Sequence, residues 1–183
     1  MGDTYYEYLF KRRTTILDVM LRIFSVLLSI SGVAIAFLMF RFLGIFSALI
    51  EVGLIYLTLF VFRRTSVEIE YCYLNGDCQF DKIFGRTKRK GYGKLEVSKI
   101  EIMAEEGDKE LESYENSPYR LRDFSSLYPD ARRFVAFTRK DSELIKVIFE
   151  PTDEMLESMQ LLAPSKVHVD RELLSEIKRN IRG

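Results

Sequence analysis

One nearly continuous apolar run of forty residues, Ile23 to Phe62, constrains this 183-residue chain more than any other feature. Its first part carries no charged residue, Arg41 interrupts it, and its second part carries only Glu51. A membrane-spanning helix needs about 20 predominantly apolar residues. The sequence therefore predicts a transmembrane hairpin over residues 23–64, with two spanning helices and a tight turn that ends near Gly44.

Basic residues flank this run at both ends. Those outside it are Lys11, Arg12, Arg13, Arg22, Arg63 and Arg64, whereas the turn has only Arg41. Segments rich in Lys and Arg remain on the cytoplasmic side of a membrane. We therefore expect a two-span protein of the cell membrane with both termini in the cytoplasm. No small-residue cleavage site follows the first span, so we expect an uncleaved anchor.

Residues 1–22 combine aromatic and basic side chains beside the first predicted span. Ile16, Leu17, Met20 and Leu21 have helical spacing. Aromatic and basic residues suit the headgroup layer of a membrane. The segment therefore predicts an amphipathic helix that lies at the interface or runs directly into the first span.

Small residues recur four apart within the hairpin, at Gly32 and Ala36 and again at Gly44 and Ala48. Small residues with this spacing let two helix backbones approach closely in lipid. We therefore expect these four residues to lie where the two spans pack together.

Glu51 is the one acidic residue within the predicted spans. It shares a face with Ala48, so it should point toward the partner helix near Ser29, Ser31 or Gly32. A carboxyl group at this depth is costly unless it is protonated, paired or hydrated. It is either a protonated structural acid bonded to a serine within the hairpin, or a proton or ion site, or a contact to a larger membrane partner.

From Val67 onward the apolar period changes from that of a helix to that of a strand. Asn75-Gly76 is a strong signal for a two-residue hairpin turn. In that register one face carries Val67, Ile69, Tyr71, Tyr73, Cys78, Phe80, Lys82 and Phe84. Cys72 falls on the opposite face from Cys78, so no disulfide between them is expected. Two Cys and a distant His168 are too few ligands for a structural zinc site.

A basic group lies close in sequence to the end of the hairpin. It consists of Arg63, Arg64, Arg86, Lys88, Arg89, Lys90 and Lys94. Each basic residue near an anionic membrane surface contributes about 1 kcal/mol to binding. The group is either a contact for anionic lipid headgroups or a solvated edge strand that is kept charged against aggregation.

The remaining chain alternates strand and loop signals and ends in helical ones. Strands are predicted at 100–104, 118–124, 132–139 and 143–149, an acidic solvated loop at 105–115, a helix between Thr152 and Pro164, and another after Asp170. The expected divisions are the N-terminal helix (1–22), the hairpin (23–64), a β domain with its helix (65–165) and an amphipathic tail helix (166–183). Short strands with turns at this spacing favour a sandwich or partly open barrel.

The predicted class is thus an α+β membrane protein, with about seven antiparallel strands capped by a C-terminal helix. This order resembles pleckstrin-homology-like (PH-like) domains. The stretches VEIEYCYLNGDCQFDKIFGRTKRK (67–90), KLEVSKIEIMA (94–104) and VIFEPTDEMLESMQLLAPSKV (147–167) resemble an uncharacterised family of small bacterial membrane proteins. That resemblance covers most of residues 15–169 and implies an N-terminal transmembrane hairpin with a cytoplasmic PH-like domain. It implies no catalytic residue and no cofactor.

Charge and motifs narrow the function. Residues 1–64 sum to +3 and residues 65–183 to −3, too little positive charge to indicate nucleic acid. No Gly-x-Ser-x-Gly turn and no phosphate-binding Gly loop occurs, so no enzyme is expected. We expect a membrane-anchored binding or scaffold module with lipid and protein partners. The alternative is an accessory subunit of a transporter or envelope complex, contacting it through the hairpin and Glu51.

Overall fold

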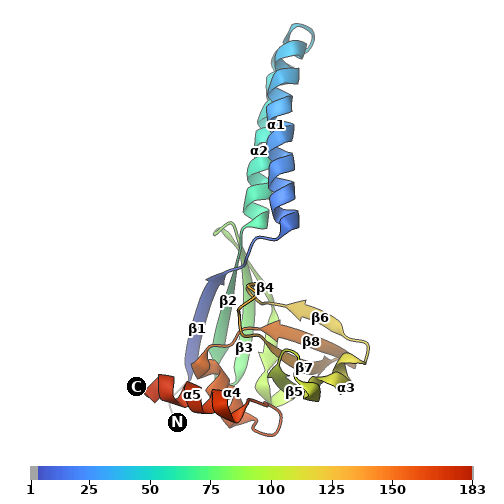
Figure 1. The fold of residues 1–183 in the computed structure, drawn as a ribbon. Coiled ribbons are helices and arrows are strands. Elements are labelled where there is room, and N and C mark those ends of the chain that lie inside the picture. Colours follow the sequence, from blue (N-terminus) through green and yellow to red (C-terminus); the bar gives the residue numbers. More distant parts are fainter. Residues whose placement is uncertain (1–3, 183) are drawn as a thin grey trace. The chain divides into compact units, whose positions relative to one another are not determined.

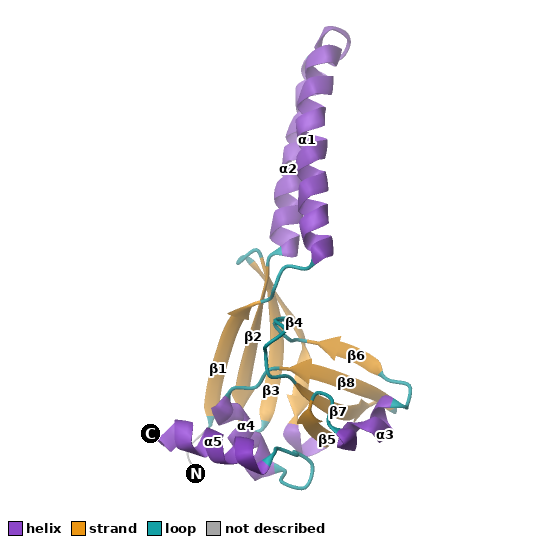
Figure 2. Cartoon of the chain, in the orientation of Figure 1, coloured by secondary structure: helices purple, strands orange, loops and turns teal. Residues whose placement is uncertain are grey.

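The computed structural model describes residues 4–182. The start of the predicted N-terminal helix (residues 1–3) and the last residue of the predicted tail helix (residue 183) lie outside the described part. The elements are β1 (Tyr5–Lys11), α1 (Ile16–Leu43), α2 (Ile45–Thr65), β2 (Val67–Leu74), β3 (Asp77–Phe84), β4 (Lys88–Glu96), η1 (Val97–Lys99), β5 (Ile100–Glu105), η2 (Lys109–Leu111), α3 (Glu112–Glu115), β6 (Arg120–Asp123), β7 (Phe134–Lys140), β8 (Glu143–Phe149), α4 (Asp153–Leu162) and α5 (Arg171–Arg182) (Figures 1 and 2).

These elements form two compact units. The hairpin unit comprises Arg13–Glu68 and residues 83–89, which form the β3–β4 turn and its flanks. The β domain comprises the chain up to Arg12, Ile69–Lys82 and the chain from Lys90 onward.

The hairpin consists of two helices that are long and apolar enough to cross a membrane. Thr15 and Asp18 start α1 with a capping box, in which each side chain accepts a hydrogen bond from the other residue's backbone N–H. Gly44, at φ 54°, makes the turn into α2. This left-handed backbone conformation favours glycine, so the predicted turn lies where the sequence places it.

The two helices lie side by side and contact one another through a seam of mainly small and polar residues (Figure 1). The less exposed positions of α1 include Arg22, Ser25, Ser29, Gly32 and Ala36, and those of α2 include Ser47, Glu51, Leu54, Thr58, Val61 and Thr65. Their alternating three- and four-residue spacing is that of a coiled-coil seam. We call these eleven positions the polar seam. Large apolar side chains cover the outside of both helices.

The N-terminal segment forms strand β1, so the predicted N-terminal helix is wrong for Tyr5–Lys11. Aromatic residues with a period of two suit a strand that is buried on one face. The Tyr6 ring stacks on Tyr73 at 6.1 Å between centroids, and the Phe10 ring meets Tyr71 edge-on at 5.2 Å. The helical spacing in this region belongs instead to the first turns of α1.

Strand β1 makes the β domain discontinuous. The first sheet has the order β1-β2-β3-β4 (Figure 2). In the chain, α1 and α2 follow β1 and precede β2, so they separate two strands that pair in the sheet. Asn75 donates from its backbone N–H to the Thr4 carbonyl oxygen at 3.1 Å, and the Thr4 N–H donates to Asn75 Oδ1 at 3.0 Å. The expected domain of residues 65–165 therefore lacks the strand that precedes the hairpin.

The second sheet has the order β5-β7-β8-β6. Strands β5, β7 and β8 are antiparallel neighbours, with Ala136 opposite Val147. Strand β6 is parallel to β8, with Arg122 beside Val147, so the all-antiparallel prediction is wrong for this strand. The connection of residues 124–133 carries the chain from one side of β8 to β7 on its other side, which lets β6 run in the same direction as β8.

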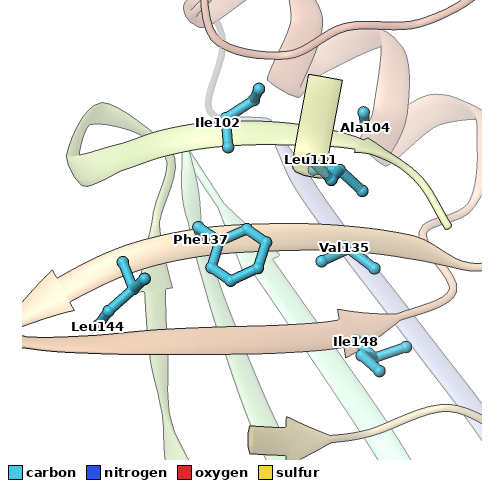
Figure 3. Close-up of a cluster of buried hydrophobic side chains, with 7 residues drawn as sticks. All are labelled: Ile102, Ala104, Leu111, Val135, Phe137, Leu144 and Ile148. Atoms are coloured by element: carbon cyan, nitrogen blue, oxygen red, sulfur yellow. The ribbon is translucent and has the colours of Figure 1, made fainter. Parts of the chain in front are cut away.

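Strands β5, β7 and β8 of the second sheet are buried on both faces. On one face, shown in Figure 3, β5, β7 and β8 contribute a cluster of Ile102, Ala104, Val135, Phe137, Leu144 and Ile148, joined by Leu111. Leu111 and Tyr114 come from the segment that was predicted to be a solvated acidic loop. That prediction is wrong for residues 109–115, which form short helical turns, because Leu111 covers the sheet in the middle of the acidic run.

The other core lies between the two sheets and centres on Tyr71. Its hydroxyl donates to the Phe124 carbonyl oxygen at 2.6 Å and accepts from the Glu150 N–H at 3.2 Å. Phe80 stacks on Phe124 at 4.4 Å and meets Phe149 edge-on. As predicted, α4 starts at a Thr152 cap, and its apolar face is buried.

The C-terminal helix α5 packs beside α4 (Figure 1). Ile177 is fully buried, and Asn180 Nδ2 donates to Asp153 Oδ2 at 3.3 Å. Just before α5, Val167 forms a parallel bridge to Met103 of β5. The β domain therefore extends beyond the predicted boundary at residue 165 and includes the tail helix.

Candidate functional site

Basic side chains from two parts of the sequence meet in the hairpin unit. Arg63 and Arg64 lie in the last turn of α2, and the β3–β4 turn and the start of β4 supply Arg86, Lys88 and Arg89. We call these five residues the hairpin base. The Gly85 N–H donates to the Ser66 carbonyl oxygen at 2.8 Å, which ties the β3–β4 turn to the end of α2.

Gly85 allows this close approach. Its φ of 55° is a backbone conformation that side chains rarely adopt. A Cβ atom at Gly85 would also lie 3.1 Å from the Cα atom of Arg63. A larger residue would therefore push the turn away from α2 and separate the two groups of basic side chains.

The hairpin base is exposed and positively charged. All five of its side chains are exposed. Arg64 lies over the Phe84 ring, 5.2 Å from its centroid, and Arg86 Nε lies 3.1 Å from Glu68 Oε1. The ion pair offsets part of the charge of Arg86, so Arg63, Arg64 and Lys88 are the best candidates to meet an anionic surface.

Lys90 and Lys94 were predicted to belong to the same basic group, but they lie in the β domain. Lys94 Nζ lies 2.8 Å from Asp77 Oδ2, and this hydrogen-bonded pair raises the pKa of Lys94. Lys90 Nζ lies over the Tyr92 ring, 5.3 Å from its centroid. Strand β4 is one of the two edges of the first sheet, so its charges also suit the predicted edge strand.

Glu51 faces the partner helix within the polar seam, which is the orientation that its spacing predicts. Ser29 Oγ donates to Glu51 Oε1 at 3.2 Å. The other oxygen, Oε2, is buried without a hydrogen-bond partner among the described residues. It lies against Gly32, where a Cβ atom would come within 2.6 Å of it. The geometry therefore gives Glu51 a contact inside the hairpin.

Two of the four residues that were predicted to pack between the helices, Gly44 and Ala48, do not belong to the polar seam. Gly32 and Ala36 are partly buried and line a groove of about 150 Å³ between α1 and α2. Gly44, however, forms the turn, and Ala48 is exposed while Ser47 beside it is buried. Because α2 begins only after Gly44, its inward face starts at Ser47, one position away from the predicted face.

Sequence patterns missed one further group of basic residues. Lys82, Arg120 and Arg122 line a cavity of the β domain together with Lys90. Lys82 and Arg122 are forty positions apart, so no local spacing indicates their proximity. In residues 4–182, no group of three or more His, Cys, Asp or Glu side chains could hold a metal ion.

Both cysteines are free. Cys78 is buried in the core, and burial raises its pKa. Cys72 is partly exposed, and burial raises its pKa as well. A raised pKa makes a thiol less reactive at neutral pH.

Comparison with known proteins gives one match. A family model described as a bacterial PH-like domain (DUF6106) matches residues 2–169. The matched region therefore includes the two apolar helices and ends just before α5. Searches of curated proteins and of solved structures returned no match.

Proposed function

The chain belongs to the bacterial PH-like domain family DUF6106, and from this premise we propose that it is a non-enzymatic, membrane-anchored binding module. In this proposal α1 and α2 cross the cell membrane, and both termini lie in the cytoplasm. The PH-like domain is thereby presented at the cytoplasmic membrane face, where it binds lipid headgroups or protein.

The exposed surface of the hairpin supports membrane insertion. Phe37 and Phe42 are 83% and 80% exposed, and large apolar side chains surround both helices. A continuous apolar surface of this extent is unfavourable in water and marks a contact with lipid or protein. The basic flanks and the single Arg41 near the turn favour the cytoplasmic orientation.

The hairpin base is the observation that carries the proposal. Arg63 and Arg64 end the second apolar helix, and the Gly85–Ser66 hydrogen bond holds the β3–β4 turn beside them. Basic residues at the end of a spanning helix lie at the depth of the headgroups. We therefore expect Arg63, Arg64 and Lys88 to bind anionic lipid at about 1 kcal/mol each.

The alternative, an accessory subunit that contacts a larger assembly through Glu51, has less support. Glu51 is hydrogen-bonded to Ser29 and lies against Gly32, so it occupies the seam between the two helices. A contact to a separate membrane protein would require this carboxyl group on the outer surface of the hairpin.

Co-purification tests the proposal. The intact chain is extracted from membranes in mild detergent, and its bound lipids and proteins are identified by mass spectrometry. We expect anionic lipid to be enriched over zwitterionic lipid. The triple variant Arg63→Gln, Arg64→Gln, Lys88→Gln should lose about 100-fold in binding, the effect of three contacts of about 1 kcal/mol.

A charge-matched control shows whether lipid binding depends on the hairpin base or only on the total positive charge of the chain. Lys109, Lys140 and Lys178 are exposed in the β domain, and changing all three to Gln removes the same charge. If this control loses as much lipid as the first variant, the hairpin base is not the lipid site. A stoichiometric membrane protein that is lost in Glu51→Gln would favour the subunit alternative instead.

A further inference from the structure

The two sheets of the β domain leave a basic cavity between two of their edge strands. Strand β4 ends the first sheet and β6 ends the second. A cavity of about 390 Å³ lies between them and is lined by residues of β3, β4 and β6 and by Phe124. The two edges are bridged by Arg122, whose Nη1 donates to the Tyr92 carbonyl oxygen at 3.0 Å.

Four cationic side chains line this cavity: Lys82, Lys90, Arg120 and Arg122. Lys82, on β3, is partly buried, whereas Lys90 and Arg120 are exposed. Its Nζ donates to the Asp123 carbonyl oxygen at 3.0 Å and lies over the rings of Tyr92 and Phe124, at 5.1 and 5.2 Å from their centroids. Burial lowers the pKa of Lys82, and the nearby charge of Arg12 lowers it further.

The cavity holds little negative charge to balance these cations. Asp123 is the one acidic residue that lines it, and Asp123 Oδ1 accepts hydrogen bonds from the N–H and the hydroxyl of Ser125 at 2.8 and 2.7 Å. Arg120 reaches Glu143 at 3.8 Å, with both side chains more than half exposed. Exposed ion pairs of this kind contribute little. The lining residues therefore sum to about three positive charges.

We infer that this cavity, formed by Lys82, Lys90, Arg120 and Arg122, binds the phosphate group of a small phosphorylated compound or of a lipid headgroup. Lysine ammonium and arginine guanidinium groups are the side chains that best bind phosphate. The volume lies within the range of small-molecule sites and exceeds the size of a bare phosphate. Tyr92 and Phe124 give the same cavity an apolar wall for the rest of such a compound.

This inference goes beyond the proposed function, because none of its four residues belongs to the hairpin base. The cavity could therefore prove not to bind phosphate while the chain is still a membrane-anchored binding module. The reverse also holds, since the cavity lies wholly within the β domain.

The test uses the full chain in two settings. In uncharged detergent, glycerol 3-phosphate and inorganic phosphate are titrated in a calorimeter. In nanodiscs of phosphatidylcholine, with or without phosphatidylglycerol, lipid enrichment around the protein is measured. Binding in detergent identifies a free phosphorylated compound as the ligand, whereas enrichment of phosphatidylglycerol alone identifies a headgroup.

The double variant Lys90→Gln, Arg120→Gln should weaken whichever binding is seen by tenfold or more. Both residues are exposed, so the fold should survive. Lys82→Met keeps the aliphatic packing on Tyr92 and should have the same effect. Lys94→Gln is the control, because Lys94 lies on the same strand as Lys90 but pairs with Asp77. This variant should leave the binding of phosphate unchanged.

Two outcomes would overturn the inference. One is the absence of binding in both settings. The other is binding that Lys94→Gln weakens as much as the double variant does. The Arg63/Arg64/Lys88 variant should leave the binding of glycerol 3-phosphate unchanged, which separates this cavity from the hairpin base.

Discussion

The hairpin and the β domain bury opposite kinds of side chain. Within the hairpin the most buried residues are Ser25, Ser47 and Thr65, while large apolar residues face outward. Within the β domain the most buried side chains are aromatic and aliphatic, with Tyr71 and Phe80 at the centre, and most of the charges face outward. The two regions thus have opposite patterns of burial.

This difference is the one expected if the β domain lies in water and the hairpin in lipid. In water, apolar side chains gain free energy by leaving the solvent, so a large apolar core stabilises a domain. In lipid that gain is absent, and helices associate through close backbone contact and hydrogen bonds between them. The inverted pattern of the hairpin therefore supports the proposal that it lies in a membrane.

The largest effect is expected in the core of the β domain. Phe80 is 1% exposed and contacts the rings of Phe124, Tyr71 and Phe149. Phe80→Ala removes a buried aromatic ring and should lower the free energy of unfolding by about 3–5 kcal/mol. Urea unfolding in mild detergent, followed by circular dichroism of the strands, measures this loss.

The control for this variant is Leu161→Ala, because Leu161 is 68% exposed on α4. It should change the stability of the β domain by less than about 0.5 kcal/mol. The association of α1 with α2 should be unaffected by either variant. If Phe80→Ala weakened the hairpin as much as the domain, the two units would not be independent in stability.

The next largest effect is expected where the helices approach most closely. A Cβ atom at Gly32 would clash with Leu54 Cδ1 and would lie 2.6 Å from Glu51 Oε2. Gly32→Leu should therefore separate the helices and destabilise the hairpin by about 1–3 kcal/mol. The chain has no Trp, so a fluorophore pair placed on the two helices reports their separation as SDS is added.

Gly53 provides a matched control, because it lies in α2 with no atom within 4 Å of its Cβ position. Gly53→Leu should leave the separation of the helices unchanged. An equal loss in Gly53→Leu and Gly32→Leu would mean that glycine matters for flexibility and not for close packing at the polar seam.

The sequence predicts those features that arise from local patterns. The spans follow from the length of the apolar run, and β2 and β3 follow from alternation around Asn75-Gly76. The inward orientation of Glu51 follows from its spacing on a helix. In each case the neighbours that decide the structure lie within a few residues, so a short window contains the information.

The features that the sequence does not reveal depend on partners far along the chain. Strand β1 pairs with β2 across the whole hairpin, and its aromatic residues pack on Tyr71 and Tyr73. The basic cavity likewise joins Lys82 to Arg122 through the meeting of two sheet edges. The inward face of α2 depends on the residue at which the turn ends. If that residue is predicted one position too late, Ala48 is assigned to the inward face in place of Ser47.

The smallest effect is expected from the loss of one hydrogen bond in the polar seam. This loss tests whether individual hydrogen bonds stabilise the hairpin. Ser29 and Ser31 lie two positions apart on α1. Ser29 Oγ donates across the seam to Glu51, whereas Ser31 Oγ donates to the Leu28 carbonyl oxygen of its own helix. Hydrogen bonds between helices in lipid contribute about 0.6 kcal/mol on average. Ser29→Ala should therefore weaken the hairpin by about that amount in the SDS titration, and Ser31→Ala should not. Equal losses would show that serine acts here through its size, and the seam would then be held by close packing at Gly32 without a contribution from Glu51.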